Sequence, residues 1–301
     1  MIDIVPYDSR WPEEFEALAK PLRDALGKHA VRVDHIGSTA VPGLVAKDKI
    51  DIQVTVYKLS SEVKVAITSL GYVHHAELTA DHRPPQTTGP DEGWKKWTFS
   101  APAGQRPANV HVRVEGRANQ RYALLFRDYL QTHPATRDAY GIIKQQLARL
   151  HPGDPDAYYA IKDPVCDLIW QAAEEWEQRE DIHMEKKRVE SWVEGYLKAW
   201  NSNDPGDIGR LFAEKASYYT GPFDEPWQGR EAIVHGWLDR KDEPGTFNFR
   251  YEVLATAEDL GIVRGWTKYF EPEREYGNLW LIRINDQGRC MEFTEWWVQR
   301  T

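Results

Sequence analysis

The apolar positions along this 301-residue chain form a mixed helix-and-strand pattern, then a helical one, and then a second mixed pattern. Residues 12–27 carry apolar side chains at helical spacing. Every second residue is apolar in residues 50–56 and 109–115, which is the period of a half-buried strand. Weaker patterns predict strands at 30–36, 72–77 and 94–101, a helix at 60–70, and helices throughout 117–180. The first part of the chain is therefore predicted to be a mixed sheet with helices.

A charged stretch with few apolar side chains, residues 174–188, separates this part from a second mixed pattern. We place a domain boundary there, so that the domains are predicted at 1–182 and 183–301. The second begins with an amphipathic helix from Val189 and continues with short helices at 208–212 and 231–238. Four strands should follow, at 246–255, 262–270, 276–285 and 290–299. The predicted fold class is α+β with two domains, the second a cone-shaped α+β barrel.

Composition narrows the classes of function. The net charge of −9 is shared almost equally by the two halves, so neither has the basic excess that proteins use to neutralise nucleic-acid phosphates. The only two cysteines, Cys166 and Cys290, lie in different predicted domains, which argues against a disulfide framework and a thiolate zinc site. There is no apolar run of about 20 residues and no secretory signal pattern. We expect a cytoplasmic protein without nucleic-acid or membrane partners.

The segment with the most chemical content is HIGSTAVPGLVAKDKIDIQV, residues 35–54. The turn at Gly37 and Ser38 can offer backbone N–H groups and a hydroxyl to phosphate oxygens. Asp51, on the polar side of the following strand, can hold a divalent cation that bridges the phosphates of a nucleoside triphosphate. The spacing of turn and carboxylate thus predicts a phosphate-binding and metal-binding site.

Several segments resemble the GrpB-like family, and the resemblance covers residues 1–178. They are HIGSTAVPGL, the AKDKIDI strand, DHRPP, the NVHV strand, and FRDYLQTHP with the downstream YGIIKQQLA. The resemblance implies the fold of DNA polymerase β-like nucleotidyltransferases, in which a Gly-Ser turn precedes a strand with Asp-x-Asp or Asp-x-Glu. It implies that Gly37 and Ser38 contact phosphate and that Asp51 is the first ligand of Mg²⁺ or Mn²⁺.

The sequence departs from this pattern at the second carboxylate, where Gln53 stands. An amide can coordinate Mg²⁺ but adds no negative charge, so it weakens a two-metal clamp. His111 and Glu115 are candidates for a third ligand, and His111 suits Mn²⁺ better than Mg²⁺. The predicted catalytic residues are Asp51, Gln53 and His111. The other polar candidates for an anionic substrate are Lys47, His82, Arg83 and Arg113, with His35, Lys49 and Arg127.

The first hypothesis is therefore an enzyme that transfers a nucleotidyl group from a nucleoside triphosphate to a small acceptor. The alternative, motivated by Gln53, is a nucleotide- or phosphate-binding module without turnover. GrpB-like domains also occur fused to dephospho-CoA kinases. This chain has no Gly-x-x-x-x-Gly-Lys-Ser/Thr loop, so it is not itself such a kinase.

The second half resembles SnoaL-like domains of the nuclear transport factor 2 class over residues 187–300, in its first helix and in LFAEKASYY, PWQGREAIVHGW and CMEFTEWWVQ. The resemblance implies a pocket between a curved sheet and helices, and its members include isomerases and cyclases. The ionisable candidates for that pocket are Tyr219, His235, Asp239, Arg264, Glu292 and Glu295. The domain could hold an isomerase or hydrolase site, bind the acceptor, or form a homodimer through its aromatic side chains.

Overall fold

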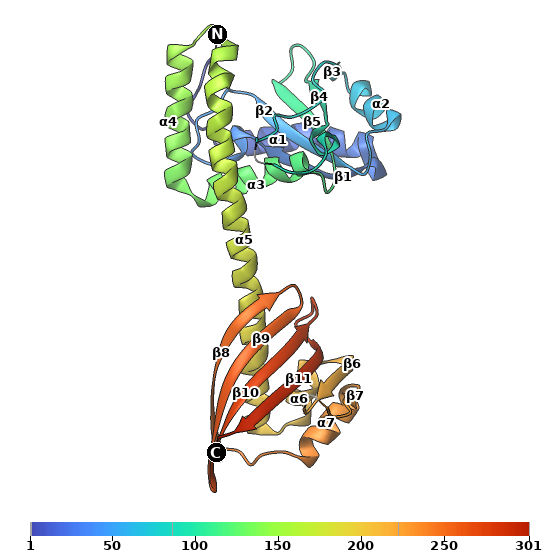
Figure 1. Ribbon diagram of the computed structural model, residues 1–301. Coiled ribbons are helices and arrows are strands. Elements are labelled where there is room, and N and C mark those ends of the chain that lie inside the picture. The colour runs from blue at the N-terminus through green and yellow to red at the C-terminus, as the bar shows by residue number, and fades with distance from the viewer. Residues whose placement is uncertain (1, 86, 222, 301) are drawn as a thin grey trace. The chain divides into compact units, whose positions relative to one another are not determined.

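The computed structural model describes residues 2–85, 87–221 and 223–300 (Figure 1). It divides into two compact units, residues 1–177 and 178–301, and both are α+β as predicted. Helix α5, Pro155–Ser202, continues through the charged stretch at 174–188, where the pattern predicted a break between two helices. The prediction of a break was wrong because Glu, Gln, Lys and Arg are good helix formers and need no apolar partner. None of the helices in the described part of the chain combines the length and the apolar character needed to cross a membrane.

The first unit contains a five-stranded sheet with the order β1-β2-β5-β4-β3. Its strands are β1 Ala30–Ile36, β2 Ile50–Val56, β3 Val73–His75, β4 Trp97–Ser100 and β5 Ala108–Val114. Strands β2 and β5 are parallel, while the other neighbouring pairs are antiparallel, so the sheet is mixed as predicted. Short 3-10 helices occur at η1 Gly27–His29, η2 Ser38–Ala40 and η3 Asp91–Trp94.

One face of this sheet is apolar and packs against helices α1, Trp11–Leu26, and α2, Ser61–Ser69. The side chains of Ile50, Ile52 and Val54 on β2 are fully buried in this core. Because alternate side chains of a strand point to opposite faces, Asp51, Gln53 and Thr55 lie on the other face.

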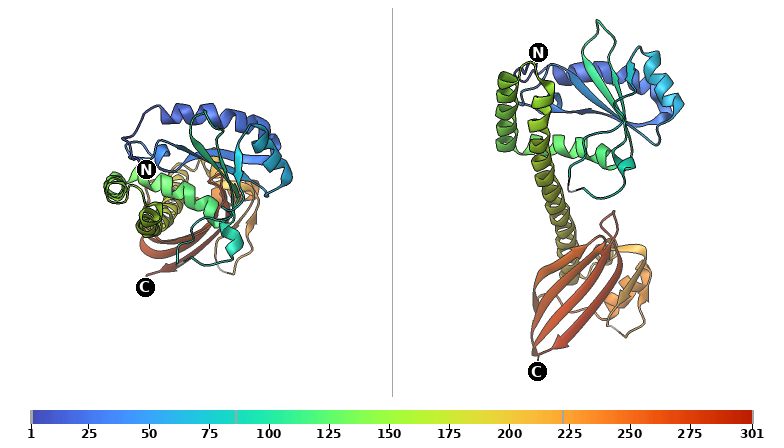
Figure 2. Two further views of the ribbon diagram at one scale, coloured as in Figure 1. Left: turned by 90° about the horizontal axis from the view of Figure 1, so that it is seen from above. Right: turned by 45° about the horizontal axis from the view of Figure 1, so that its top comes forward.

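That second face is also covered, by helix α3, Ala118–Thr132. Helix α4, Pro134–Leu150, and the first part of α5 run beside each other and pack against α3 and the loop after β1 (Figures 1 and 2). Gln53 and Thr55 are 0% and 1% exposed. The prediction of a half-buried strand was therefore wrong for β2, because α3 packs over its polar side as well.

The second unit contains the last part of α5, helices α6, Pro205–Leu211, and α7, Arg230–Asp239, and a six-stranded sheet in the order β7-β6-β11-β10-β9-β8. The strands are β6 Phe212–Tyr219, β7 Trp227–Gln228, β8 Phe247–Ala257, β9 Leu260–Phe270, β10 Glu273–Ile284 and β11 Cys290–Gln299. The four predicted strands are present as β8 to β11, whereas β6 and β7 were missed. The core is rich in aromatic side chains and includes Trp192 and Tyr196 of α5.

Candidate functional site

A cavity of about 750 Å³ in the first unit contains the Gly-Ser turn, the polar side of β2 and β5, and residues of α3, α4 and α5. Its charged lining is mainly basic. Among the described residues that line it, the basic side chains are Lys47, Lys49, Lys96, Arg113, Lys144 and Lys162, and the carboxylates are Asp51, Asp81 and Asp163. The cavity is thus rich in positive charge although the chain has a net charge of −9.

The Gly-Ser turn and Asp51 meet at this cavity. Gly37 has φ +71°, and a Cβ atom at this position would lie 2.7 Å from the Asp51 Oδ2 atom. Only glycine allows the carboxylate to approach the backbone so closely in this left-handed conformation. Ser38 follows at the start of η2 and lines the same cavity. The structure therefore brings together the three residues on which the sequence-based hypothesis depended.

Asp51 is surrounded by hydrogen-bond donors. Its Oδ1 atom accepts a hydrogen bond of 2.9 Å from Asn109 Nδ2, and His111 Nε2 lies 3.5 Å from the same oxygen. Burial would raise the pKa of Asp51, but the contacts with His111 and Asn109 outweigh it and leave this pKa below the usual value. The Asp51 side chain remains 30% exposed. It is an ionised carboxylate at the cavity surface.

His111 lies between this carboxylate and a lysine. Burial lowers the pKa of His111, so the imidazole is neutral at pH 7. Its Nδ1 atom is 3.4 Å from Lys96 Nζ. Since the ammonium group can only donate, Nδ1 is the acceptor and the Nε2 proton faces Asp51.

Gln53 does not reach the cavity, which corrects its predicted role beside Asp51. Its Oε1 atom accepts a hydrogen bond of 2.7 Å from Arg113 Nη1, and its Nε2 atom donates one of 3.2 Å to the Gln120 carbonyl. Both polar atoms of the amide are thus used within the protein. Gln53 acts as a buried link between β2, β5 and α3.

A two-metal clamp does not fit these residues. Asp81 accepts hydrogen bonds from Arg113 Nε at 2.8 Å, Lys96 Nζ at 2.7 Å and Asn119 Nδ2 at 3.0 Å, so its charge is already compensated. Glu115, the other predicted ligand, lies beyond the end of β5 and is exposed. The described residues contain no group of three or more His, Cys, Asp or Glu side chains that could hold a metal ion.

Lys144 lines the same cavity and was not among the predicted site residues. Its Nζ atom donates a hydrogen bond of 2.8 Å to Ser38 Oγ and another to the Val45 carbonyl, and Lys144 is only 3% exposed. Burial, with the charge of Lys162 nearby, lowers the pKa of Lys144 to about 7. The sequence pattern did indicate that Lys144 is buried, because it lies at helical spacing from Tyr140 and Leu147 on the buried side of α4.

The remaining basic candidates differ in their surroundings. Lys47 lines the cavity, where its Nζ atom lies 4.9 Å from the ring centroids of both Tyr158 and Tyr159. His82 also lines it, with Nε2 2.9 Å from Asp167 Oδ1.

Arg83 does not line the cavity, which corrects its predicted role in phosphate binding. It donates instead to Thr87, Gly89 and Asp91 of its own loop. His35 and Arg127 are also occupied elsewhere, since the His35 ring stacks on Phe15 and Arg127 donates to the His35 carbonyl.

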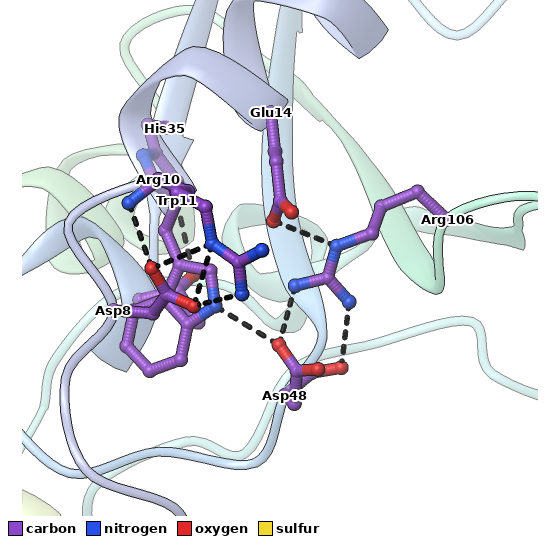
Figure 3. A network of polar contacts seen from close by, with 8 residues as sticks. Asp8, Arg10, Trp11, Glu14, His35, Asp48 and Arg106 are labelled. Carbon is purple, nitrogen blue, oxygen red and sulfur yellow. Dashed lines mark hydrogen bonds and ion pairs between the residues drawn. The ribbon is translucent and has the colours of Figure 1, made fainter.

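A separate polar network anchors the loop that carries Lys47 and Lys49 (Figure 3). Trp11 Nε1 donates a hydrogen bond of 2.9 Å to Asp48 Oδ1. Arg106 donates to Glu14 Oε2 at 2.7 Å and to the Asp48 carbonyl at 3.0 Å. Asp48 is therefore tied to α1 and to the loop before β5, which fixes the position of the two neighbouring lysines.

In the second unit, a cavity of about 380 Å³ is lined by Glu295 but by none of the other ionisable candidates. On β11, Phe293 is 0% exposed and Glu295 points to the same side, whereas Glu292 lies on the outer side near Arg283. The other candidates lie outside the cavity as well. His235 and Asp239 form an exposed pair on α7, Arg264 pairs with Glu252 on the outer side of β9, and Tyr219 is the last residue of β6.

Two family models match the sequence: one described as "GrpB protein" matches residues 1–172, and one described as "SnoaL-like domain" matches residues 193–298. A dephospho-CoA kinase of Mycolicibacterium paratuberculosis is 37% identical over 158 residues, which cover 48% of this chain and 39% of that protein. The UPF0157 protein BH1888 of Halalkalibacterium halodurans is 34% identical over 147 residues, covering 48% of this chain and 68% of that protein.

Among solved structures, the conserved protein GrpB from Enterococcus faecalis matches with a TM-score of 0.48 and 29% identity, over 58% of this chain and 99% of that one. An NTF-2 like protein of unknown function from Burkholderia xenovorans LB400 matches with a TM-score of 0.34 and 14% identity, over 39% of this chain and 88% of that one. The chain spans about two fifths of the length of the dephospho-CoA kinases that it matches.

Proposed function

Since the chain belongs to the GrpB protein family and carries a SnoaL-like domain at residues 193–298, we propose that its first unit binds a phosphorylated small molecule, with a nucleoside triphosphate as the first candidate. The observation that carries this proposal is the basic lining of the cavity around Ser38 and Asp51. Of the three carboxylates there, Asp81 and Asp163 are already paired with basic side chains. The remaining lysines of the lining, Lys47, Lys49 and Lys144, are left to attract an anion.

Ser38 and Lys144 are the groups that would hold a phosphate. The hydroxyl and the ammonium group lie 2.8 Å apart at the wall of the cavity. An anion beside Lys144 would restore its positive charge, so binding at pH 8 should take up protons. The rings of Tyr122, Phe126 and Tyr140 line the same cavity and supply a surface for a nucleobase.

A second candidate function is transfer of a nucleotidyl group to a small acceptor. It is favoured by the ionised Asp51, which could accept a proton from an acceptor hydroxyl while the Nε2 proton of the neutral His111 imidazole faces its carboxylate. Asp51 would be the one carboxylate available to a Mg²⁺ or Mn²⁺ ion that arrives with the triphosphate.

The mycobacterial relatives named dephospho-CoA kinase suggest a second ligand to test. Dephospho-CoA also combines a nucleotide with phosphate groups, so the same basic cavity suits it. The chain covers only 39% of the length of the first of these relatives, and a kinase activity is not part of the proposal.

The test is calorimetric titration of the full chain with each nucleoside triphosphate, dephospho-CoA and inorganic tripolyphosphate. Lys144→Met should weaken binding about tenfold or more, because a charge-assisted hydrogen bond is lost. Lys20→Met is the matched control, since Lys20 is an exposed lysine of α1 outside the cavity. Failure of all these ligands to bind, or equal effects of both variants, would contradict the proposal.

A measurement of pyrophosphate release separates the two candidates. Release that disappears in Asp51→Asn would support nucleotidyl transfer. Nucleotide binding without release would support a binding module.

A further inference from the structure

The cavity of the second unit combines aromatic walls with carboxylates. Aromatic side chains from α5, α7 and the sheet line it, among them Trp200, Tyr218, Trp227, Trp237 and Tyr269. The carboxylates of Asp242 and Glu295 lie among them and are only partly exposed, whereas that of Asp224, which also lines the cavity, is exposed. The basic side chains that also line the cavity, Arg240, Lys241 and Arg274, are exposed.

Glu295 is held by neutral tyrosines. The Tyr218 hydroxyl donates a hydrogen bond of 3.0 Å to Glu295 Oε1. The Tyr196 hydroxyl lies 2.9 Å from the Tyr218 oxygen and must donate to it, because the Tyr218 proton is already used. Burial, together with the charge of Asp242, raises the pKa of Glu295 to about 7 despite the hydrogen bond from Tyr218 and the positive charge of Arg240.

Asp242 is held in a similar way. Its Oδ2 atom accepts hydrogen bonds of 2.9 Å from Trp200 Nε1 and 2.8 Å from Tyr269 Oη. Within the described parts of the chain, neither Asp242 nor Glu295 has a basic side chain within ion-pair distance, 4.0 Å. Buried carboxylates are normally compensated by a positive partner, so two of them without one in a single cavity call for an explanation.

We propose that this cavity binds a small organic cation, with its ammonium group between Asp242 and Glu295 and against the surrounding aromatic rings. An ammonium group would supply the missing positive charge, and the faces of Trp and Tyr rings attract cations. A neutral ligand of the same shape would leave both carboxylates without a positive partner at ion-pair distance. This cavity lies wholly in residues 196–297, so the inference does not depend on the function proposed for the first unit.

Choline and its uncharged isostere 3,3-dimethylbutan-1-ol are suitable probes, because they differ in charge and hardly in shape. Calorimetric titration of the full chain should show choline binding at least about tenfold more tightly than the isostere. Absence of choline binding at millimolar concentration, or equal affinities for the two probes, would overturn the inference.

Substitutions in the cavity test whether choline binds between Asp242 and Glu295. Glu295→Gln and Asp242→Asn keep the acceptor oxygens for the tyrosine and tryptophan donors but remove the charge, and each should weaken choline binding about tenfold or more. Glu292→Gln is the matched control on β11, because Glu292 is 49% exposed and does not line the cavity. Thermal unfolding confirms that each variant is folded. Unchanged affinity in folded Glu295→Gln and Asp242→Asn, or an equal loss in the control, would overturn the inference.

Discussion

The carboxylates in the two cavities of this chain have different kinds of hydrogen-bond partner. In the first unit, the carboxylate of Asp81 is surrounded by Arg113 and Lys96, and further lysines line the wall. In the second unit, Asp242 and Glu295 are held by tyrosine and tryptophan donors that carry no charge. The partners of the buried and partly buried carboxylates thus differ between the two cavities.

The largest expected effect is the loss of stability when a buried arginine is removed from the first unit, compared with the loss when an exposed arginine is removed from the second. Arg113→Met leaves Asp81 and Gln53 without their main partner in the core, so it should destabilise the first unit by about 3–5 kcal/mol. Arg264→Met in the second unit breaks an exposed pair with Glu252 and should cost less than about 1 kcal/mol. Urea unfolding of both variants measures the two values. Similar losses would show that the network around Arg113 is no stronger than a surface pair.

The second expected effect concerns Glu295. The pKa of Glu295 is raised from 4.5 to about 7, so the folded unit holds this proton more tightly than the unfolded chain does. Stability of the second unit should therefore fall as the pH rises from about 4.5 to about 7, and the loss should persist above pH 7. Glu295→Gln removes this cost and should stabilise the unit at pH 8 by up to about 3 kcal/mol.

Thermal unfolding of wild type and variant between pH 4 and pH 8 checks this prediction. Lys144 in the first unit should have the opposite effect on stability. Its pKa is lowered from 10.5 to about 7, so the unfolded chain holds this proton more tightly, and the stability of the first unit should rise as the pH increases above about 7. A Glu295→Gln variant whose stability changes with pH as the wild type does would show that Glu295 is not the group responsible.

A smaller effect should come from two glycines. Gly37→Ala places a Cβ atom 2.7 Å from Asp51 Oδ2 at φ +71° and should cost about 2 kcal/mol. Gly277→Ala on β10 meets no atom within 4 Å and should change stability by less than about 0.5 kcal/mol. Chemical denaturation of the two variants provides the comparison. Equal stability of the two would mean that Asp51 moves away from the turn at little cost.

The sequence was most informative where the local pattern was strong. The alternation in β2 and β5 predicted both strands and the polar side on which Asp51 and His111 lie. Strand β6 was missed because Glu214 and Lys215 interrupt its apolar alternation. The continuous α5 was missed because a charged stretch is as compatible with a helix as with a linker.

Only part of the candidate site could be predicted, because some of its contacts join residues that are far apart in the sequence. The positions of Ser38 and Asp51 could be predicted because they lie close together in the chain. The contact of Lys144 with Ser38, 106 positions away, could not be predicted, although the helical spacing indicated that Lys144 is buried. The burial of Gln53 depends on Arg113 and on the Gln120 carbonyl of α3, which no pattern within β2 could reveal.

The most direct test of the opposite ligand preferences proposed for the two cavities is a crossed titration of the intact chain. Tripolyphosphate and choline are titrated in turn into the wild type, Lys144→Met and Glu295→Gln. We expect Lys144→Met to weaken only tripolyphosphate binding and Glu295→Gln to weaken only choline binding, each by about tenfold or more. If either folded variant weakens both ligands equally, or neither variant changes either affinity, the account is contradicted.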